Sequence, residues 1–227
     1  MIIDKSWFYD ISNILDTEII INENLVVSIY DAWIYTRKIY LWFNSIVEYF
    51  WFIYNSQINN IEFYQNEENS NLKVKYLHYS VDNKKIKSRI YSNIKSNKSK
   101  SDVKILSIIG ENWDIDLDWI IEISKWYEKI VWNLIEENLF LWESWKIKWI
   151  PTLLVRSDDV EASHACKIEK ISNDKLFYLK SRWVEEKSAL MLLLEANIKS
   201  IFSCLSMLDN DFYTNLILKI TDIINKK

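Results

Sequence analysis

A single glycine, Gly110, stands in this chain of 227 residues, which also holds twelve tryptophans. Average usage of about 7% would give a chain of this length roughly 16 glycines. Tight turns with a positive φ favour glycine because it lacks a Cβ atom. Any fold that this chain adopts must therefore build its turns from other residues.

Several tryptophans stand where turn sequences favour glycine. Residues 112–114, 118–119, 143–146 and 181–183 each place a tryptophan beside polar residues that are typical of turns. We interpret most of the twelve as the product of UGA codons that are meant as glycine, as in an alternative genetic code. The nucleotide sequence tests this hypothesis, because UGG codons at these positions would contradict it.

Composition limits the class of protein. A chain of this length holds one domain with a sizeable core, or one domain with an appendage. The net charge of −4 argues against a nucleic-acid binder, which usually carries a basic face. The first ten residues lack the pattern of a signal peptide, and no apolar run approaches the roughly 20 residues that cross a bilayer. We expect a cytoplasmic protein with no membrane span, and two cysteines suggest no disulfide framework.

A long series of short strands is predicted between residues 18 and 171. The segments are rich in Ile, Val, Tyr and Phe, and many alternate in polarity. They are residues 25–30, 33–41, 45–54, 61–64, 72–79, 84–91, 103–109, 115–123 and 152–156. Regular spacing of turn positions through short strands is typical of a coiled β-solenoid, although a sandwich or barrel would also have evenly spaced strands. We favour the solenoid slightly.

The pattern becomes helical after Asn173. An apolar stripe at helical spacing runs through residues 190–205, and a second helix is expected after residues 209–211. This predicts two parts: a β-helix core over residues 1–174 and a C-terminal α-helical hairpin over residues 175–227. We expect the hairpin to cover the open end of the solenoid.

A resemblance to a known family enters at Pro151. The pieces that carry it are Pro151 with the apolar strand after it, and the segments at 157–160, 163–164, 176–179 and 181–186. In this order they resemble the core of the SufB/SufD family, the scaffold proteins of Suf iron–sulfur cluster assembly. The match extends over about residues 103–200. The family has glycine after its Ser-Arg pair, where this chain has Trp183.

The resemblance implies a fold and a set of partners. The fold is a right-handed parallel β-helix followed by helices. The partners would be a SufB-like chain, or a second copy of this one, joined through the β-helix cores, and a SufC-like ATPase of the ABC type docked on the C-terminal helices. The chain itself would be non-catalytic, and an iron–sulfur cluster would be held transiently at a shared interface.

Two positions indicate which branch of the family this chain is similar to. SufB-like chains carry Glu-His-Glu where this chain has Ser163-His164-Ala165, and an acceptor cysteine where Glu136 stands here. The run from Asp158 to His164 instead follows the SufD-like pattern. We identify the chain as SufD-like, or as a reduced member that pairs with itself.

His164 and Cys166 are the candidate ligands for iron or a cluster. Imidazole and thiolate both bind iron. SufD-like chains often have a cysteine two residues before the histidine, where this chain has Ala162. In an extended segment, Ala162, His164 and Cys166 project from one face, so a thiol remains within reach of the imidazole. The alternatives are a structural histidine and a small buried cysteine.

Other residues are assigned to partner binding. Asp158 and Asp159 are adjacent carboxylates, for which a turn role or a hydrogen bond to a partner is favoured over a metal site. Ser163 belongs to the same motif. Arg182, Glu185 and Glu186 are expected to cap the first helix and orient it. His78 is assigned no role, and Cys204 is expected in the core of the helices.

No catalytic motif emerges from the chain. We find no nucleophilic triad, phosphate-binding loop or zinc-ligand spacing, even when tryptophan is replaced by glycine in the search. The chain itself is therefore not expected to bind or hydrolyse ATP. The alternatives that remain are a β-helix enzyme acting on polysaccharides and a purely structural interaction module.

Overall fold

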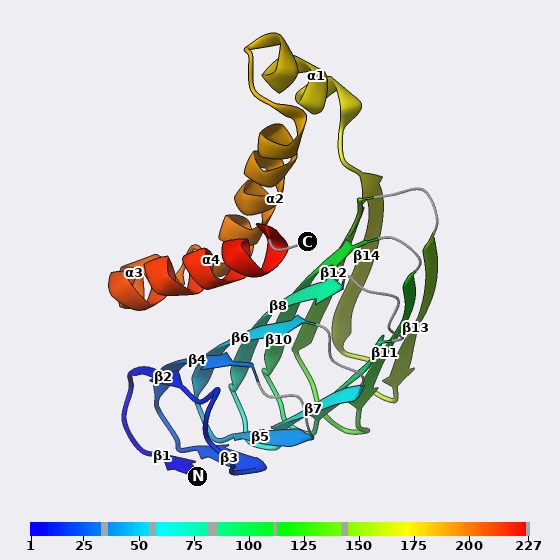
Figure 1. Ribbon diagram of the computed structural model, residues 1–227. Coiled ribbons are helices and arrows are strands. Elements are labelled where there is room, and N and C mark those ends of the chain that lie inside the picture. Colours follow the sequence, from blue (N-terminus) through cyan, green and yellow to red (C-terminus); the bar gives the residue numbers. More distant parts are fainter. Residues whose placement is uncertain (33–35, 55–57, 81–85, 111–112, 142–144, 226–227) are drawn as a thin grey trace.

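The protein is a two-sheet parallel β-solenoid followed by helices (Figure 1). The computed structural model describes residues 1–225 except 33–35, 55–57, 81–85, 111–112 and 142–144. Successive strands alternate between two sheets of seven strands each, and every described pairing is parallel. The predicted parallel β-helix is confirmed, and the sandwich or barrel is excluded, because neither winds consecutive strands into two parallel stacks.

The strands lengthen along the chain. The first sheet contains β1 (Ile2–Ile3), β3 (Glu18–Ile21), β5 (Arg37–Leu41), β7 (Ile58–Gln65), β9 (Ile86–Ile94), β11 (Trp113–Ile123) and β13 (Trp145–Val155). The second contains β2 (Phe8–Asp10), β4 (Val26–Asp31), β6 (Ile46–Tyr54), β8 (Asn71–Ser80), β10 (Lys100–Ile109), β12 (Ile130–Phe140) and β14 (Val160–Lys170). In the second sheet Phe8 pairs with Ser28, an offset of 20 residues, whereas Ile130 pairs with Val160, an offset of 30. Each turn of the solenoid therefore becomes longer toward the C-terminal end.

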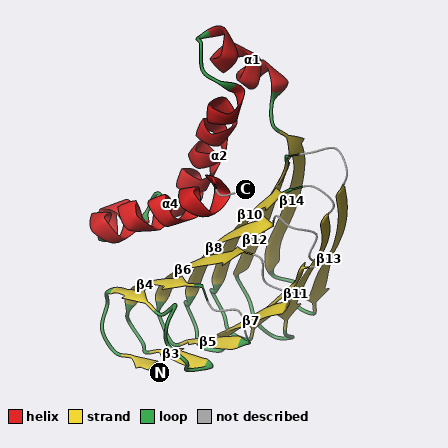
Figure 2. Cartoon of the chain, viewed as in Figure 1, coloured by secondary structure: helices red, strands yellow, loops and turns green. Residues whose placement is uncertain are grey.

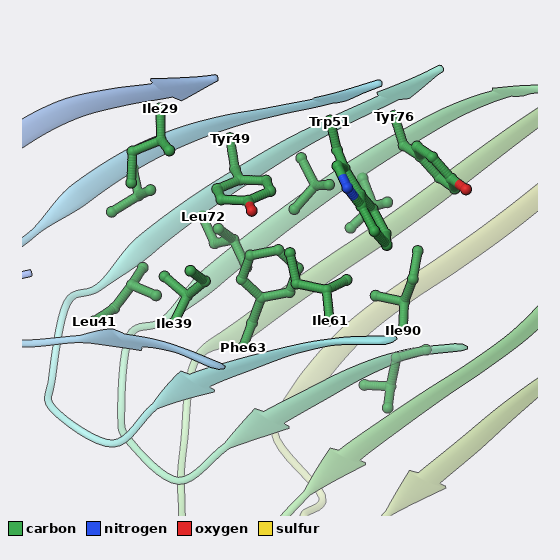
Figure 3. Close-up of a cluster of buried hydrophobic side chains, with 14 of the residues drawn as sticks. Ile29, Ile39, Leu41, Tyr49, Trp51, Ile61, Phe63, Leu72, Tyr76 and Ile90 are labelled. Carbon is green, nitrogen blue, oxygen red and sulfur yellow. The ribbon is translucent and has the colours of Figure 1, made fainter. Parts of the chain in front are cut away.

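The core between the sheets follows from the alternation of side chains along each strand. On β6, Val47, Tyr49, Trp51 and Ile53 point into the space between the sheets and are almost fully buried. Figure 3 shows Tyr49 and Trp51 facing residues of the opposite sheet such as Phe63. The ring centroids of Trp51 and Tyr76 are 4.6 Å apart in a stacked arrangement. Burial of these rings and of the Ile and Val side chains around them is the main stabilisation of the solenoid.

The chain ends in helices, and the two long ones pack on the outer face of the second sheet (Figure 2). They are α1 (Asn173–Ser181), α2 (Glu186–Phe202), α3 (Leu205–Leu208) and α4 (Asn210–Asn225). The two long helices confirm the expected helical region, and α1 and α3 are short additions to it. α2 packs on β8 and β10. The ring of Phe212 on α4 contacts Phe8 and Tyr30, with centroids 4.9 and 5.1 Å away.

The placement of these helices corrects one expectation. The helical region covers the outer face of the second sheet, where Phe50, Phe52 and Leu77 are buried beneath it. It does not cover the open end of the solenoid, because β14, the last strand of that sheet, is exposed along ten of its eleven residues. The physical reason is that β6 and β8 carry apolar side chains on both faces, so their outer face needs cover more than the end does.

One corner of the solenoid is built by residues in the left-handed region. Asn24, Asn44 and Asn69 have φ of 59°, 53° and 58°, and Lys98 and Lys129 occupy the same corner in later coils with φ of 57° each. Asparagine adopts this conformation more readily than other residues with a side chain. Asn44 Nδ2 donates to Asn24 Oδ1 at 2.9 Å, and Asn69 Nδ2 donates to Asn44 Oδ1 at 2.5 Å. Asparagine, rather than glycine, therefore makes the first corners.

Some of the described tryptophans are exposed in the left-handed region, and others are buried inside strands. The second group corrects part of the turn prediction. Trp126 and Trp183 have φ of 74° and 65° and are exposed, as expected of positions that favour glycine. Trp119 instead lies inside β11 and is buried, so the turn prediction is wrong there. Trp113 and Trp145 are the first residues of strands. The hypothesis of UGA-encoded glycine stays a prediction.

Trp51 and Trp132 resemble Trp119 in being buried within strands. Their indoles fill the space between the sheets, which glycine would leave empty. The indole nitrogens of Trp119 and Trp132 nevertheless have no hydrogen-bond partner among the described residues. A buried N–H without a partner carries a desolvation cost. Trp119 and Trp132 therefore fill the space between the sheets well but leave their indole N–H groups without a hydrogen bond among the described residues.

Trp183 follows the end of α1 in a motif that normally uses glycine. Arg182 is the C-cap of α1, the N–H of Trp183 donates to Lys180 O at 3.0 Å, and the N–H of Val184 donates to Leu179 O at 3.3 Å. These two bonds form a Schellman motif, whose left-handed residue is usually glycine because a Cβ atom is disfavoured there. The Trp183 side chain is 98% exposed and gains no burial in return.

We expect Trp183→Gly to stabilise the folded chain by roughly 1 kcal/mol, because it removes the cost of a left-handed residue with a Cβ atom. Chemical denaturation of the two proteins measures the change in the free energy of unfolding. Trp132→Gly is the matched control, and it should destabilise by about 3–5 kcal/mol because it empties a buried site. A loss of stability in Trp183→Gly would contradict the prediction.

A buried ion pair fixes the N-terminal coils. Arg37 Nε lies 2.8 Å from Asp31 Oδ2, and both side chains are 1% exposed. Arg37 also donates to the carbonyl oxygens of Asp16 at 2.7 Å and Ile14 at 3.1 Å, and Tyr49 donates its hydroxyl to Asp31 at 2.5 Å. Burial and the Asp31 carboxylate hold the pKa of Tyr49 well above its usual range. The network ties the segment before β3 to the solenoid, since each charge is compensated inside the core.

A histidine is buried in the interior of the second sheet. His78 on β8 is fully buried, and neither ring nitrogen has a hydrogen-bond partner among the described residues. It lies beside Ile53 and Ser107 in the register of the sheet, and its ring stacks on Tyr76 with centroids 5.9 Å apart. Burial lowers the pKa of His78 to about 4. The ring is therefore neutral at physiological pH.

Candidate functional site at the open end of the solenoid

The open end of the second sheet carries the candidate ligands. β14 pairs with β12 on one side and is the terminal strand of the sheet on the other. Its first residue, Val160, is half-buried and the remaining ten are exposed. An eleven-residue strand of this kind presents a row of unpaired backbone N–H and C=O groups, which is a template for pairing with another strand.

His164 and Cys166 lie on β14 as the sequence predicts, two residues apart on one face. In the register with β12, His164 pairs with Leu134 and Cys166 pairs with Glu136. Leu134 and Glu136 are buried between the sheets. The imidazole and the thiol therefore project on the inner face of the sheet, one strand beyond its buried part, and both are exposed.

The surroundings of Cys166 favour the protonated thiol. Burial on one side and the negative charge of Glu136 raise the pKa of Cys166, while a hydrogen bond from Asn138 acts in the opposite direction. Asn138 Nδ2 lies 3.7 Å from Cys166 Sγ. An iron ion or cluster bound here would have to displace the thiol proton, since the thiolate is the ligand. The structure thus gives Cys166 neighbours that can hold it in place but do not ionise it.

The environment of His164 suits a neutral ligand. Partial burial lowers the pKa of His164. A neutral imidazole offers a nitrogen lone pair to a metal, whereas the protonated ring does not. Thiolate and imidazole together are a donor set that suits iron or a cluster.

The candidate site is incomplete within the part of the chain that the structure describes. Among the residues that the structure describes, no group of three or more His, Cys, Asp or Glu side chains is arranged to hold a metal ion. His164 and Cys166 supply two ligands on an exposed edge. Further ligands would have to come from outside the described part of this chain.

Asp158 and Asp159 lie apart from this pair, at the corner before β14. The Oδ2 of Asp159 accepts from the N–H of Lys129 at 3.1 Å, and its carbonyl oxygen accepts from Ile130 at 3.3 Å. Asp158 and Asp159 line a hollow of about 390 Å³ together with residues such as Arg156. Cys166 lies seven positions after Asp159, which corresponds to about 23 Å along an extended strand. The structure does not bring the carboxylates to the candidate ligands, and Asp159 serves the corner.

The remaining predicted residues lie on two other surfaces. Ser163 Oγ donates to Asn133 Oδ1 at 2.6 Å on the outer face of β12 and β14. Arg182 is the C-cap of α1 and lies over the Tyr178 ring, and Glu185 precedes α2. Glu186, in the first turn of α2, accepts from Lys180 on α1 at 2.5 Å. These three residues shape the connection between α1 and α2, beyond the end of β14 in Figure 1.

Glu136 and Asn138 are neighbours of Cys166 that the sequence reasoning did not assign to the site. These two residues can be found from the sequence once the number of residues in one coil of the solenoid is known. Leu134 and His164 are register partners, an offset of 30 residues, so residues 136 and 138 must stand beside 166 and 168. Once β12 is recognised as a strand, the neighbours of any residue on β14 follow by counting.

Comparison with known proteins supplies the family. Residues 44–197 match the family described as "SUF system FeS cluster assembly, SufBD core domain". That segment covers more than half of the chain and includes β14 with both candidate ligands. The chain belongs to the SufB/SufD core family. The resemblance found at Pro151 is thereby confirmed, and the chain is a member of a family of iron–sulfur cluster assembly.

A curated relative is similar over part of its length. The chain is 24% identical over 133 residues to the "Iron-sulfur cluster assembly protein SufD" of Escherichia coli (strain K12). The aligned segment covers 58% of this chain and 31% of that protein, so the chain spans about a third of the relative's length. Among the described residues, no helix is long and apolar enough to cross a membrane.

Proposed function

We propose that this chain is a non-catalytic, SufD-like scaffold subunit of iron–sulfur cluster assembly, which pairs with a SufB-like chain or with a second copy of itself. The observation that carries the proposal is the long exposed edge of β14, which holds His164 and Cys166 side by side. An edge that is open for strand pairing and carries an incomplete set of ligands suits a site that two chains complete together.

The cluster is cargo at this interface. His164 and Cys166 would each donate one ligand, and the partner chain would supply the others. Asn138 lies beside the Cys166 sulfur, while burial and the charge of Glu136 favour the protonated thiol, whose proton iron would displace. This arrangement favours transient holding over permanent binding, because metal and proton compete for the same sulfur.

The helical region offers a surface for a second partner, which we propose is a SufC-like ATPase of the ABC type. α1 has no buried residue, and Phe177 and Tyr178 are 75% and 58% exposed. Exposed aromatic residues on one helix are typical of a surface that another protein covers. Arg182, Glu185 and Glu186 hold the angle between α1 and α2, so they would set the geometry of this surface.

Removal of the candidate ligands should lower the amount of cluster that the complex holds. We expect Cys166→Ala and His164→Ala each to reduce iron and sulfide content after anaerobic reconstitution by on the order of tenfold, the scale of losing a group that supports a metal site. Iron and labile sulfide analysis with absorption spectroscopy measures the effect. Cys204→Ser is the matched control, since it removes the other thiol and should retain the cluster.

Three results would contradict the proposal. Unchanged cluster content in both ligand variants would contradict the assignment of His164 and Cys166 as ligands. Recovery of the chain alone under anaerobic, low-salt conditions, with neither a second β-helix chain nor an ABC-type ATPase, would favour a purely structural module. Hydrolysis of a polysaccharide by the purified chain would favour the β-helix enzyme.

A further inference from the structure

Lys75 and Cys204 form a close contact between the solenoid and the helical region. Lys75 Nζ on β8 donates to the Sγ of Cys204 at 2.8 Å, although 129 residues separate the two in sequence. Cys204 lies where α2 gives way to α3, as the N-cap residue of α3. The same Nζ lies 2.8 Å from Glu48 Oε1 on β6. A thiol, an amine and a carboxylate therefore meet at one point.

This point is part of the surface that holds the helices on the second sheet. Lys75 Nζ lies 5.2 Å from the centre of the Phe50 ring, and that ring is 6.3 Å from Phe202 on α2. Cys204 packs against the same apolar cluster. The Lys75 and Glu48 side chains keep 20% and 21% of their surface exposed, and Cys204 is half-buried. A small molecule can therefore reach the contact from solvent.

The charges around the two cysteines of this chain are opposite in sign. Cys204 has an ammonium group in hydrogen-bond contact, whereas Cys166 stands beside the Glu136 carboxylate. The ammonium beside Cys204 is placed to stabilise negative charge on the sulfur as it attacks an oxidant, whereas the carboxylate beside Cys166 is not. Burial opposes the charged form of Lys75, but its hydrogen bonds to Cys204 and Glu48 outweigh burial and raise the pKa of the ammonium. The charge on Lys75 is thus secure while Cys204 is reduced.

We propose that Lys75 and Cys204 are an oxidant-responsive pair, which a hydroperoxide converts into a covalent sulfur–nitrogen cross-link between the solenoid and the helical region. The contact distance and the partial exposure of these side chains suit this reaction. The cross-link joins β8 to the start of α3 and fixes the helical region against the second sheet. Thiol reductants reverse it, because they reduce the sulfur–nitrogen bond back to a thiol and an amine.

The chemistry proceeds in two balanced steps. In the first, the Cys204 thiolate attacks the distal oxygen of the hydroperoxide. The S–O bond forms and the O–O bond breaks, the sulfur is oxidised by two electrons, and the peroxide is reduced to an alcohol, or to water if it is hydrogen peroxide. In the second, Lys75 loses a proton to water and the free amine attacks the sulfenic sulfur. The S–N bond forms, the S–O bond breaks, and the leaving hydroxide takes a proton to become water.

The net change is the loss of two hydrogen atoms from the protein, which distinguishes the cross-link from other oxidations. We expect the intact chain to lose about 2 Da on treatment with hydrogen peroxide, whereas a stable sulfenic acid would add about 16 Da. Peptide mapping should join the peptide with Cys204 to the peptide with Lys75. Incubation with a thiol reductant should restore the original mass and both peptides.

Four variants test the steps. Cys204→Ser should abolish the mass loss. Lys75→Gln should also abolish it and should slow oxidation of Cys204 roughly tenfold, since the stabilising cation is lost. Glu48→Gln removes a carboxylate that favours the charged form of Lys75, so the free amine should be more available and the cross-link should form faster than in the native chain. Lys75→Arg, which retains the positive charge without a nucleophilic amine, should oxidise at a near-native rate without forming the cross-link.

Cys166 in the same chain is the internal comparison. Cys166 is the more exposed thiol, so access alone would make it react first with hydrogen peroxide. We expect Cys204 to be consumed faster because of the charge beside it. Faster oxidation of Cys166, or a sulfenic acid on Cys204 that never joins Lys75 in the native chain, would overturn the proposal. Neither result bears on cluster assembly, so the two proposals stand or fall separately.

Discussion

Ala162→Pro should strongly weaken the proposed pairing of the solenoid with a second β-helix chain while leaving the chain itself folded. The direction of the backbone groups on β14 gives the reason. The carbonyl of Asp159 accepts from the N–H of Ile130 on β12, and backbone groups of a strand in a parallel sheet alternate between its two sides. The N–H of Ala162 therefore points to the free edge, where proline removes a donor without touching the β12–β14 ladder.

We expect the affinity between chains to fall on the order of a hundredfold, equivalent to about 3 kcal/mol, because proline removes a backbone donor from the free edge and its ring obstructs a second strand there. Sedimentation analysis and co-purification measure the pairing, and chemical denaturation measures the fold. Ala165→Pro is the matched control. Its N–H points toward β12, so it should destabilise the chain itself by roughly 1–3 kcal/mol.

Native pairing in Ala162→Pro would show that β14 is not the interface. Loss of the fold in Ala162→Pro, to the same extent as in Ala165→Pro, would contradict the assignment of backbone directions. The pair of variants therefore tests the geometry of the edge and its role at once.

Acidification should destabilise the chain by roughly 3 kcal/mol through His78 alone. The pKa of this buried histidine is about 4 in the folded protein and about 6.5 when it is exposed. Because the folded value is the lower one, the unfolded chain binds the proton first as the pH falls. The contribution of neutral His78 is thus complete above pH about 6.5 and is lost progressively down to pH about 4.

The free energy of unfolding measured between pH 7 and pH 4 checks this expectation. His78→Leu should flatten the difference across that range, since leucine does not titrate and fits an apolar neighbourhood with Ile53. His164→Gln removes the other histidine, which is exposed on β14, and should change the profile much less. A profile for His78→Leu that parallels the native one would contradict the assignment of the acid sensitivity to His78.

The strands of the middle coils could be predicted from the sequence because they carry a two-residue rhythm. The expected segment 45–54 corresponds to β6, and 72–79 corresponds to β8. β12 was harder, because Glu136 and Asn138 stand among its inward-facing residues and interrupt the apolar pattern. These polar residues are tolerated inside because they lie near the open end, beside Cys166.

The turns show why residue type alone misleads. Tryptophan beside polar residues suggests a corner at both Trp119 and Trp183, yet Trp119 is on an inner face of β11 and Trp183 is in a helix cap. The difference depends on what lies opposite each residue in the next coil, which the local sequence does not contain. Asn24, Asn44 and Asn69 were the better signal, since asparagine tolerates the left-handed region.

The residues of the candidate site also divide into those that the local sequence predicts and those whose role depends on strand pairing. That His164 and Cys166 share a face follows from their spacing on an extended strand. That Asp159 serves a corner, and that Glu136 stands beside Cys166, depends on the pairing of β14 with β12. The contact between Lys75 and Cys204 could not be foreseen at all, since it joins residues 129 positions apart across two different kinds of structure.

Because the coils lengthen along the chain, the solenoid is narrow at its N-terminal end and wide at its C-terminal end. In this chain β2 has three residues, whereas β14 has eleven. If copies stacked head to tail, the long β14 of one copy would lie against the short β2 of the next. Most backbone groups on the free edge of β14 would then stay unpaired. If two copies pair through their wide ends, the two edges match in length and the assembly stops at two copies. The taper therefore favours a finite pair over a growing fibre.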